Sequence, residues 1–187
     1  MTSTAPAAYR FTRDEYYRMA EVGLFRDQRV ELLNGEIIRM SPQNTPHAST
    51  LYRVVRTLER RIGTHTCIRG QLPIVLNDWS EPEPDVAVCL PDPYDYSRAH
   101  PQPDQILLLI EVADASVSYD RGQKAAAYAL SNIPELWIVE LPTRRIVILA
   151  DPDPRAQRYQ QQQYAFPGDT LTLPGGKMIS VTDILPQ

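Results

Sequence analysis

The sequence contains very few lysines and cysteines, and both shortages are informative. Lys124 and Lys177 are the only lysines among 19 basic residues, so arginine supplies nearly all of the positive charge. The two cysteines, Cys67 and Cys89, lie in apolar segments without the spacing of a metal site. They predict buried free thiols in a reducing compartment and argue against a disulfide scaffold.

Long hydrophobic runs are also missing. No apolar segment approaches the length of a membrane span, and no charged-then-apolar leader opens the chain. We therefore expect a cytoplasmic protein that has no membrane association. The net charge of −4 argues against a broad basic surface for nucleic acid. It does not exclude a nuclease, because acids gathered at a metal site make the total charge more negative than the remaining surface.

Several common catalytic motifs are absent. The chain has neither of the glycine-rich patterns that cradle nucleotide phosphates, and it has no Gly-x-Ser-x-Gly nucleophile elbow. Its three histidines lack the spacing of zinc ligands. Nucleotide cradles, serine hydrolase chemistry of that type and zinc sites are therefore not supported.

The patterns that are present predict one α/β domain over residues 1–187, with a core of about 10–150 and C-terminal strands over 157–187. Its length and its hydrophobic share of 43% suffice for a substantial core. We expect a mixed β-sheet flanked by helices, with extra antiparallel hairpins. Helices are expected over 12–23, which opens with a capping box of Thr12 and Glu15, over 45–62, which has Thr45 as its N-cap, and over 118–130. A hairpin is expected over 29–40, and strands over 66–69, 72–76, 85–90, 105–112, 135–140, 145–150, 157–165 and 170–173. A turn at Gly175-Gly176 and a short tail follow the last strand.

The clearest local signal is Asn34-Gly35, which is flanked by strand-forming residues and predicts a type I′ hairpin turn. In that register Glu31 lies opposite Ile38, on a face that is at least half buried. An acid in this position needs a partner. It is either part of a site or an edge-strand acid bonded to an arginine.

Two further acids accompany apolar strands. Asp85 opens one strand, and Glu111 ends the apolar run 106–110, which predicts a central strand covered on both faces. A carboxylate beside a buried strand is unfavourable by several kcal/mol unless it is paired or binds a cation, so a shared metal is the favoured explanation. Two carboxylates with the Val112 carbonyl would suit Mg²⁺, and Mn²⁺ is an alternative.

Asp120, Lys124 and Tyr128 are four residues apart, so they share one helix face that could look back at Glu111. A lysine there would orient a water and offset charge on a phosphate. A plainer interpretation exists for each candidate. Asp85 could be a turn acid, and Lys124 could pair with Asp120 on a solvated face. His47 could only satisfy a helix N-terminus. The helix expected over 45–62 carries three arginines on one face, Arg53, Arg56 and Arg60. Such a face is more often solvated surface than a nucleic-acid contact.

Taken in order, these motifs resemble the Uma-two family of restriction endonucleases, which belongs to the PD-(D/E)xK nuclease superfamily. The similarity covers about residues 10–150. It is carried by Val30-Glu31-Leu32-Leu33-Asn34-Gly35-Glu36-Ile37, Ser41-Pro42 with His47, Pro84-Asp85-Val86, Ile110-Glu111-Val112, Asp120-x-x-x-Lys124-x-x-x-Tyr128, and Glu135-Leu136-Trp137-Ile138-Val139.

The resemblance implies that Asp85 and Glu111 bind the metal, that Glu31 is an additional acid and that His47 is a helper. Two positions depart from the superfamily pattern. Ala113 stands where a lysine is expected, so Lys124 would replace that lysine, and residues 114–116 differ from the usual Ser-Pro-Ser stretch.

These observations lead us to expect a Mg²⁺-dependent DNA endonuclease that self-associates. The alternative from another class is a catalytically inactive member of the fold that acts as a homo-oligomeric binding or interaction protein. A third interpretation is a metal-dependent hydrolase of RNA or of a small phosphodiester.

Overall fold

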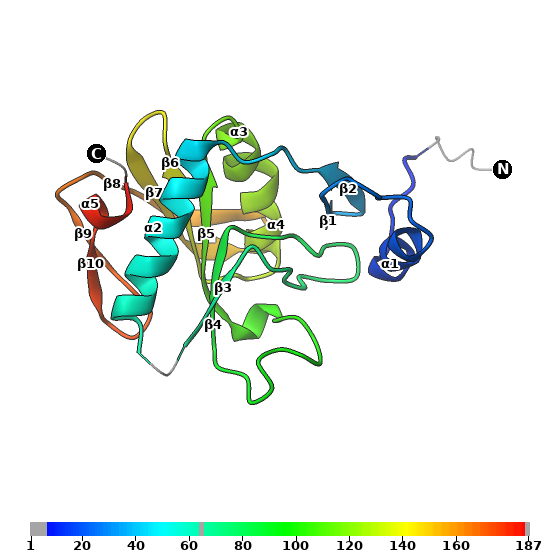
Figure 1. Cartoon of the computed structure of the whole chain (residues 1–187), viewed down its shortest axis with the longest axis horizontal. Helices are drawn as coiled ribbons and strands as arrows, with labels where there is room; N and C mark the ends of the chain where they lie inside the picture. The colour runs from blue at the N-terminus through cyan, green and yellow to red at the C-terminus, as the bar shows by residue number, and fades with distance from the viewer. Residues whose placement is uncertain (1–6, 64–65, 186–187) are drawn as a thin grey trace.

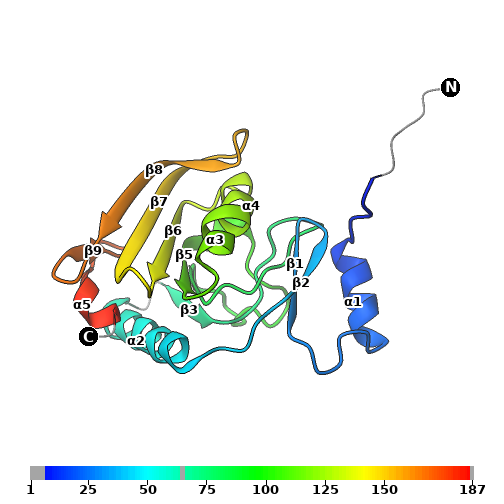
Figure 2. The same cartoon turned by 90° about the horizontal axis from the view of Figure 1, so that it is seen from above.

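The computed structural model describes residues 7–63 and 66–185, and it is built around a six-stranded sheet (Figures 1 and 2). The strand order is β3-β4-β5-β6-β7-β8. All neighbours are antiparallel except β5 and β6, which run parallel. The strands are β3 (Cys67–Gly70), β4 (Val86–Cys89), β5 (Ile106–Ala113), β6 (Glu135–Glu140), β7 (Arg145–Asp153) and β8 (Arg158–Ala165).

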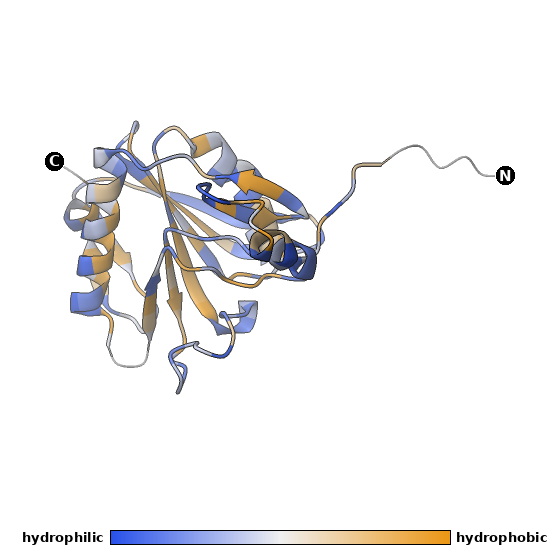
Figure 3. Cartoon of the chain, turned by 45° about the vertical axis from the view of Figure 1, so that its right-hand side comes forward, coloured by the Kyte–Doolittle hydropathy of each residue, from blue (hydrophilic) through white to orange (hydrophobic). Residues whose placement is uncertain are grey.

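The predicted central strand is confirmed as β5. Seven of its eight residues are buried, and it pairs with β4 on one side and β6 on the other. Figure 3 shows the strands of the sheet as largely hydrophobic. A parallel neighbour requires a crossover, because the chain must return to the starting end of the sheet. Here the crossover is the helical segment after β5, which carries Lys124.

Helices cover the sheet on both faces (Figure 2). The long helix α2 (Thr45–Arg61) packs through Val54 and Leu58 on one face, together with the short α5 (Val181–Ile184). The crossover covers the other face, where Tyr128 is fully buried. It consists of α3 (Val117–Tyr119), a π-helical turn η2 (Asp120–Lys124) and α4 (Ala125–Leu130).

A separate hairpin lies beside the sheet. It consists of β1 (Val30–Leu33) and β2 (Glu36–Arg39), and it pairs Glu31 with Ile38 as predicted. Asn34 and Gly35 both have positive φ, 52° and 74°, as a type I′ turn requires. The helix α1 (Arg13–Glu21) adjoins the hairpin and begins with the predicted capping box of Thr12 and Glu15.

Two sequence expectations, one about residues 72–76 and one about the first turn of α2, are wrong in detail. Residues 72–76 form no strand, because Ile74 and Val75 donate their backbone N–H groups to the loop residues Pro82 and Pro101. The N-cap of α2 is Asn44 rather than Thr45, since the Asn44 side chain accepts the backbone N–H of His47 at 3.0 Å.

The expected helix 118–130 is interrupted by η2, and the chain after the Gly175-Gly176 turn is not a simple tail. It returns as β10 (Met178–Ser180) beside β9 (Thr170–Thr172) and then forms α5. These elements are too short to show a sequence period. A short 3₁₀ turn, η1 (Pro103–Gln105), precedes β5. Within the described ranges, no helix is long and apolar enough to cross a bilayer.

Gly35→Ala should destabilise the protein, because its new Cβ would lie 2.7 Å from Cβ of Arg10 in a left-handed turn. Gly175→Ala is a matched control: its φ is also positive, at 86°, but nothing lies near its added Cβ. We expect a loss of about 1 kcal/mol for the control and about 2–3 kcal/mol for Gly35→Ala in urea unfolding. Equal losses would contradict the Arg10 contact.

Candidate active site

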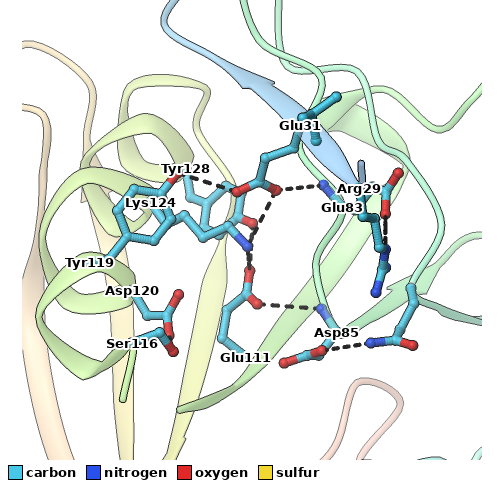
Figure 4. Close-up of polar contacts among 12 residues, drawn as sticks. Arg29, Glu31, Glu83, Asp85, Glu111, Ser116, Tyr119, Asp120, Lys124 and Tyr128 are labelled. Atoms are coloured by element: carbon cyan, nitrogen blue, oxygen red, sulfur yellow. Dashed lines mark hydrogen bonds and ion pairs between the residues drawn. The ribbon is translucent and has the colours of Figure 1, made fainter. Parts of the chain in front are cut away.

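The five candidate side chains that the sequence singles out surround one cavity of about 360 Å³. The cavity lies between the β1–β2 hairpin, the start of α2, the start of β4, the end of β5 and the crossover helices. Figure 4 shows several of the side chains that line it. Val112 also lines it. Glu31, His47, Asp85, Glu111 and Lys124 therefore meet although they are spread over more than 90 residues of sequence.

Asp85 lies at the start of β4, and its carboxylate is held on three sides. The backbone N–H of Val112 donates to Oδ2 at 2.8 Å, and the Gln71 amide donates to Oδ1 at 3.1 Å. His47 Nε2 lies 3.0 Å from Oδ2. Burial acts to raise the pKa of Asp85, but His47 and the Val112 N–H outweigh it and the pKa is lowered. Asp85 is therefore ionised at neutral pH.

Glu111 is more deeply buried than Asp85, with 3% of its surface exposed against 9% for Asp85. Tyr128 donates its hydroxyl to Oε1 at 2.6 Å, and Lys124 Nζ lies 3.0 Å from the same oxygen. The backbone N–H of Asp85 donates to Oε2 at 3.3 Å. Burial raises the pKa of Glu111 above its ordinary value, while Lys124 acts in the opposite direction and favours the carboxylate. A cation at this carboxylate would therefore compete with a proton.

Lys124 projects from the π-helical turn into a group of acids (Figure 4). Its Nζ lies 3.0 Å from Glu111 and 3.5 Å from Glu31. Burial acts to lower the pKa of Lys124, but these two carboxylates outweigh that effect and raise it. Asp120, one turn earlier, accepts the Ser116 hydroxyl at 2.6 Å and forms its hydrogen bond there rather than with Lys124. Lys124 is therefore a buried ammonium and not part of a solvated helix face.

Glu31 reaches the cavity from the hairpin. Its Oε2 accepts the backbone N–H of Glu83 at 3.0 Å, and Oε1 accepts the Tyr119 hydroxyl at 3.2 Å. Burial and Glu31 raise the pKa of Tyr119 well above its ordinary value, so Tyr119 remains a donor. Glu31 thus joins the hairpin, the loop before β4 and the crossover helices at Lys124.

Sequence patterns missed several contributors. Tyr119 and Gln71 gave no signal, since neither belongs to the four-residue spacing of the crossover or to a motif. Asn44 donates its amide to Asp114 at 2.5 Å while it also caps α2, and this contact fixes the loop that crosses one side of the cavity. The arginines of α2 do not line this cavity.

The cavity has an excess of negative charge and suits a hard cation. Six acidic side chains line it, from Glu31, Glu83, Asp85, Glu111, Asp114 and Asp120, against four basic ones, from Arg29, Arg39, His47 and Lys124. Over residues 7–63 and 66–185 there is no group of three or more His, Cys, Asp or Glu arranged to hold a metal. Two carboxylates with one backbone carbonyl are a smaller set, which fits Mg²⁺ because that ion retains several waters.

The contact between His47 and Asp85 predicts a pH-dependent contribution to stability. The hydrogen bond to Asp85 raises the pKa of His47 above 6.5, and the pKa of Asp85 is below 3.8. The His47 contribution is complete below pH 6.5 and is lost as pH rises through the folded pKa, whereas the Asp85 contribution is lost as pH falls below 3.8. The pair should therefore stabilise most between these values.

In EDTA, His47→Gln should lower the free energy of unfolding more at pH 5.5 than at pH 8.5. Urea unfolding of both proteins at the two pH values measures this difference. An equal loss at both pH values would show that His47 contributes through packing alone.

Comparison with known proteins agrees with the resemblance. A solved structure from Anabaena variabilis, described as "a putative nuclease belonging to DUF820", superimposes with a TM-score of 0.65 at 14% identity, covering 93% of this chain and 97% of that one. This match confirms the expected α/β fold, with a mixed sheet flanked by helices. None of the curated proteins matches the sequence significantly. The Uma2 family model matches residues 13–186, nearly the whole chain, so this protein belongs to the Uma2 family, described as "Putative restriction endonuclease".

Proposed function

We propose that this protein is a Mg²⁺-dependent endonuclease that hydrolyses phosphodiester bonds of DNA, with Mn²⁺ as an alternative ion. The observation that carries the proposal is the cavity in which Lys124 Nζ lies 3.0 Å from Glu111, with Asp85 joined to the same carboxylate through its backbone N–H. Membership of a nuclease family supports the same reaction class. The choice of DNA as the substrate goes beyond this membership and belongs to the proposal.

Asp85, Glu111 and the Val112 carbonyl would hold the metal. The Val112 N–H points to Asp85, and a strand residue directs its N–H and C=O to the same edge, so the carbonyl is on the side of the cavity. When bound, the ion would polarise a phosphodiester and lower the pKa of a coordinated water. All of the proposed ligands are oxygen atoms, as Mg²⁺ prefers.

The remaining residues would either act on the substrate or hold other side chains of the site in position. Lys124 would orient the attacking water and offset charge that builds on the phosphate, because its ammonium is held in a fixed, water-poor place. Glu31 is a positioning residue for Lys124, 3.5 Å from Nζ. His47 would hold Asp85 in one orientation. Arg29 and Arg39 also line the cavity and would contribute positive charge near a bound phosphate.

The structure also suggests how copies would associate. Among the described strands, β8 pairs only with β7, so one of its edges keeps unpaired backbone groups. Its sequence from Gln160 to Gln163 carries no charge that would oppose pairing with another strand. We propose a homodimer formed through this edge, which light scattering of the purified protein tests.

Purified protein should nick plasmid DNA with Mg²⁺ or Mn²⁺ and not with EDTA. Glu111→Ala and the isosteric Glu111→Gln should each reduce the rate by at least about a hundredfold, because each removes a carboxylate that would hold the metal, and with it the metal's effect on the phosphate and the water. Glu21→Ala, an exposed acid on α1, is the control and should cut normally. Unchanged cleavage by a folded Glu111→Gln protein would refute the site.

Mg²⁺ should also raise the melting temperature, because it would bind only the folded state. The stabilisation is about 2.7 kcal/mol at a hundred times the dissociation constant. Asp85→Asn should abolish the shift, and Glu21→Ala should retain it. A Mg²⁺-induced rise in melting temperature without DNA cleavage would support the metal site and contradict DNA as the substrate. The absence of both would favour an inactive interaction protein.

A further inference from the structure

The outer side of α2 carries a concentration of arginine that the proposed active site does not use. Arg53, Arg56, Arg60 and Arg61 fall within the last nine residues of this 17-residue helix. None of the four forms an ion pair or a side-chain hydrogen bond with the described residues, unlike Arg10, Arg13, Arg29, Arg121 and Arg145, which all contact carboxylates. Glu59 is the one acid among these nine residues, so this part of the helix carries an excess of positive charge.

The spacing places these side chains together. Arg53, Arg56 and Arg60 are three and four residues apart, so they share one helix face, which we call the arginine face. Tyr52 lies on the same side with 64% of its surface exposed, and the Arg56 guanidinium lies 5.5 Å from its ring centroid. The face thus combines cations with an exposed aromatic ring, the pair of groups that nucleic-acid backbones and bases contact.

A small hollow adjoins the arginine face. It has a volume of about 190 Å³ and is lined by Arg56, Thr57, Arg60, Arg61 and, from α5, Asp183. Asp183 forms no ion pair with these arginines in the described structure. The three guanidinium groups therefore exceed the single acid, and the hollow would attract an anion of the size of a phosphate group.

The arginine face lies on the helix that begins at the proposed active site. Arg53, Arg56 and Arg60 follow His47 by six, nine and thirteen residues, so at 3.6 residues per turn they project from the opposite side of α2. Asn44 and His47, at the start of α2, line the catalytic cavity, and the helix then runs away from it along the outside of the sheet (Figures 1 and 2). At 1.5 Å per residue, Arg53 lies about 9 Å and Arg60 about 20 Å beyond His47 along the axis. A DNA strand advances about 3.4 Å per nucleotide, so these distances span roughly three to six nucleotides.

We propose that the arginine face of α2 is an exosite that binds the phosphate backbone of the DNA whose scissile bond lies in the cavity. This inference rests on the proposed function. The guanidinium groups would bind phosphates without reading base sequence, so they would supply affinity and register. Such a face also explains how a protein with a net charge of −4 can bind a polyanion, because free cations are gathered at one place on its surface.

The test measures DNA binding in a Glu111→Gln background, where cleavage does not interfere. The triple variant Arg53→Gln, Arg56→Gln, Arg60→Gln is compared with Arg18→Gln, Arg26→Gln, Arg155→Gln, which removes the same charge from exposed positions on α1, in the turn after α1 and in the β7–β8 turn. Fluorescence anisotropy of a labelled duplex over a salt series gives the affinity and its salt dependence for each protein.

We expect the exosite variant to bind at least about tenfold more weakly at low salt. Its slope of log K against log salt should become shallower by about 0.9 for each phosphate that the variant no longer binds, so by about 2 to 3. The control should change affinity less than threefold. Replacing the three arginines by lysine should restore much of the binding, because the charge returns. Equal affinities and slopes for exosite variant and control would overturn the proposal.

Failure of the catalytic proposal would be visible separately. Hydrolysis of bis(p-nitrophenyl) phosphate by wild type, and its loss in Glu111→Gln, tests the cavity alone. A wild type inactive on both this ester and DNA, with an exosite variant that still binds DNA more weakly than the control, would retain the exosite and reject the nuclease. An active wild type whose exosite variant binds DNA as the control does would reject the exosite and retain the nuclease.

Discussion

The buried ion pair between Lys124 and Glu111 is the interaction on which the rest of the site depends. A carboxylate and an ammonium removed from water are each unfavourable by several kcal/mol, so each requires the other and further hydrogen bonds. Tyr128 and the Asp85 N–H satisfy Glu111, while Glu31 supplies a second acid to Lys124. Because these buried groups need one another as partners, the crossover helices, β5 and the β1–β2 hairpin pack together around Lys124.

Charge is divided unevenly over the molecule, and this division connects the two proposals. The cavity holds more carboxylates than cations, which suits a divalent ion but would repel DNA. The arginine face of α2 lies on the helix that begins at the cavity and carries free guanidinium groups. The acidic cavity would attract the metal, and the arginine face would attract the polyanion. The two could therefore bind to the protein at the same time.

Much of the fold follows from local pattern. The turn at Asn34-Gly35, the capping box of Thr12 and the apolar strand β5 appear where sequence reasoning expects them, since each depends on neighbours only a few residues away. The expected strand over 72–76 fails because its hydrogen bonds go to distant loops. The strand expected over 170–173 is confirmed as β9, whereas its partner β10 and the helix α5 were missed, since each is only three or four residues long.

The sequence by itself determined which side chains are anomalous: acids attached to apolar strands, and a lone lysine four residues from an acid and a tyrosine. Burying such groups requires partners, and that rule holds without coordinates. Only the tertiary structure decided which residues are the partners. Lys124 pairs with Glu111 and Glu31 rather than with Asp120, and His47 meets Asp85. These contacts join residues far apart in the chain, so their geometry is set by how the sheet, hairpin and helices pack and not by sequence spacing.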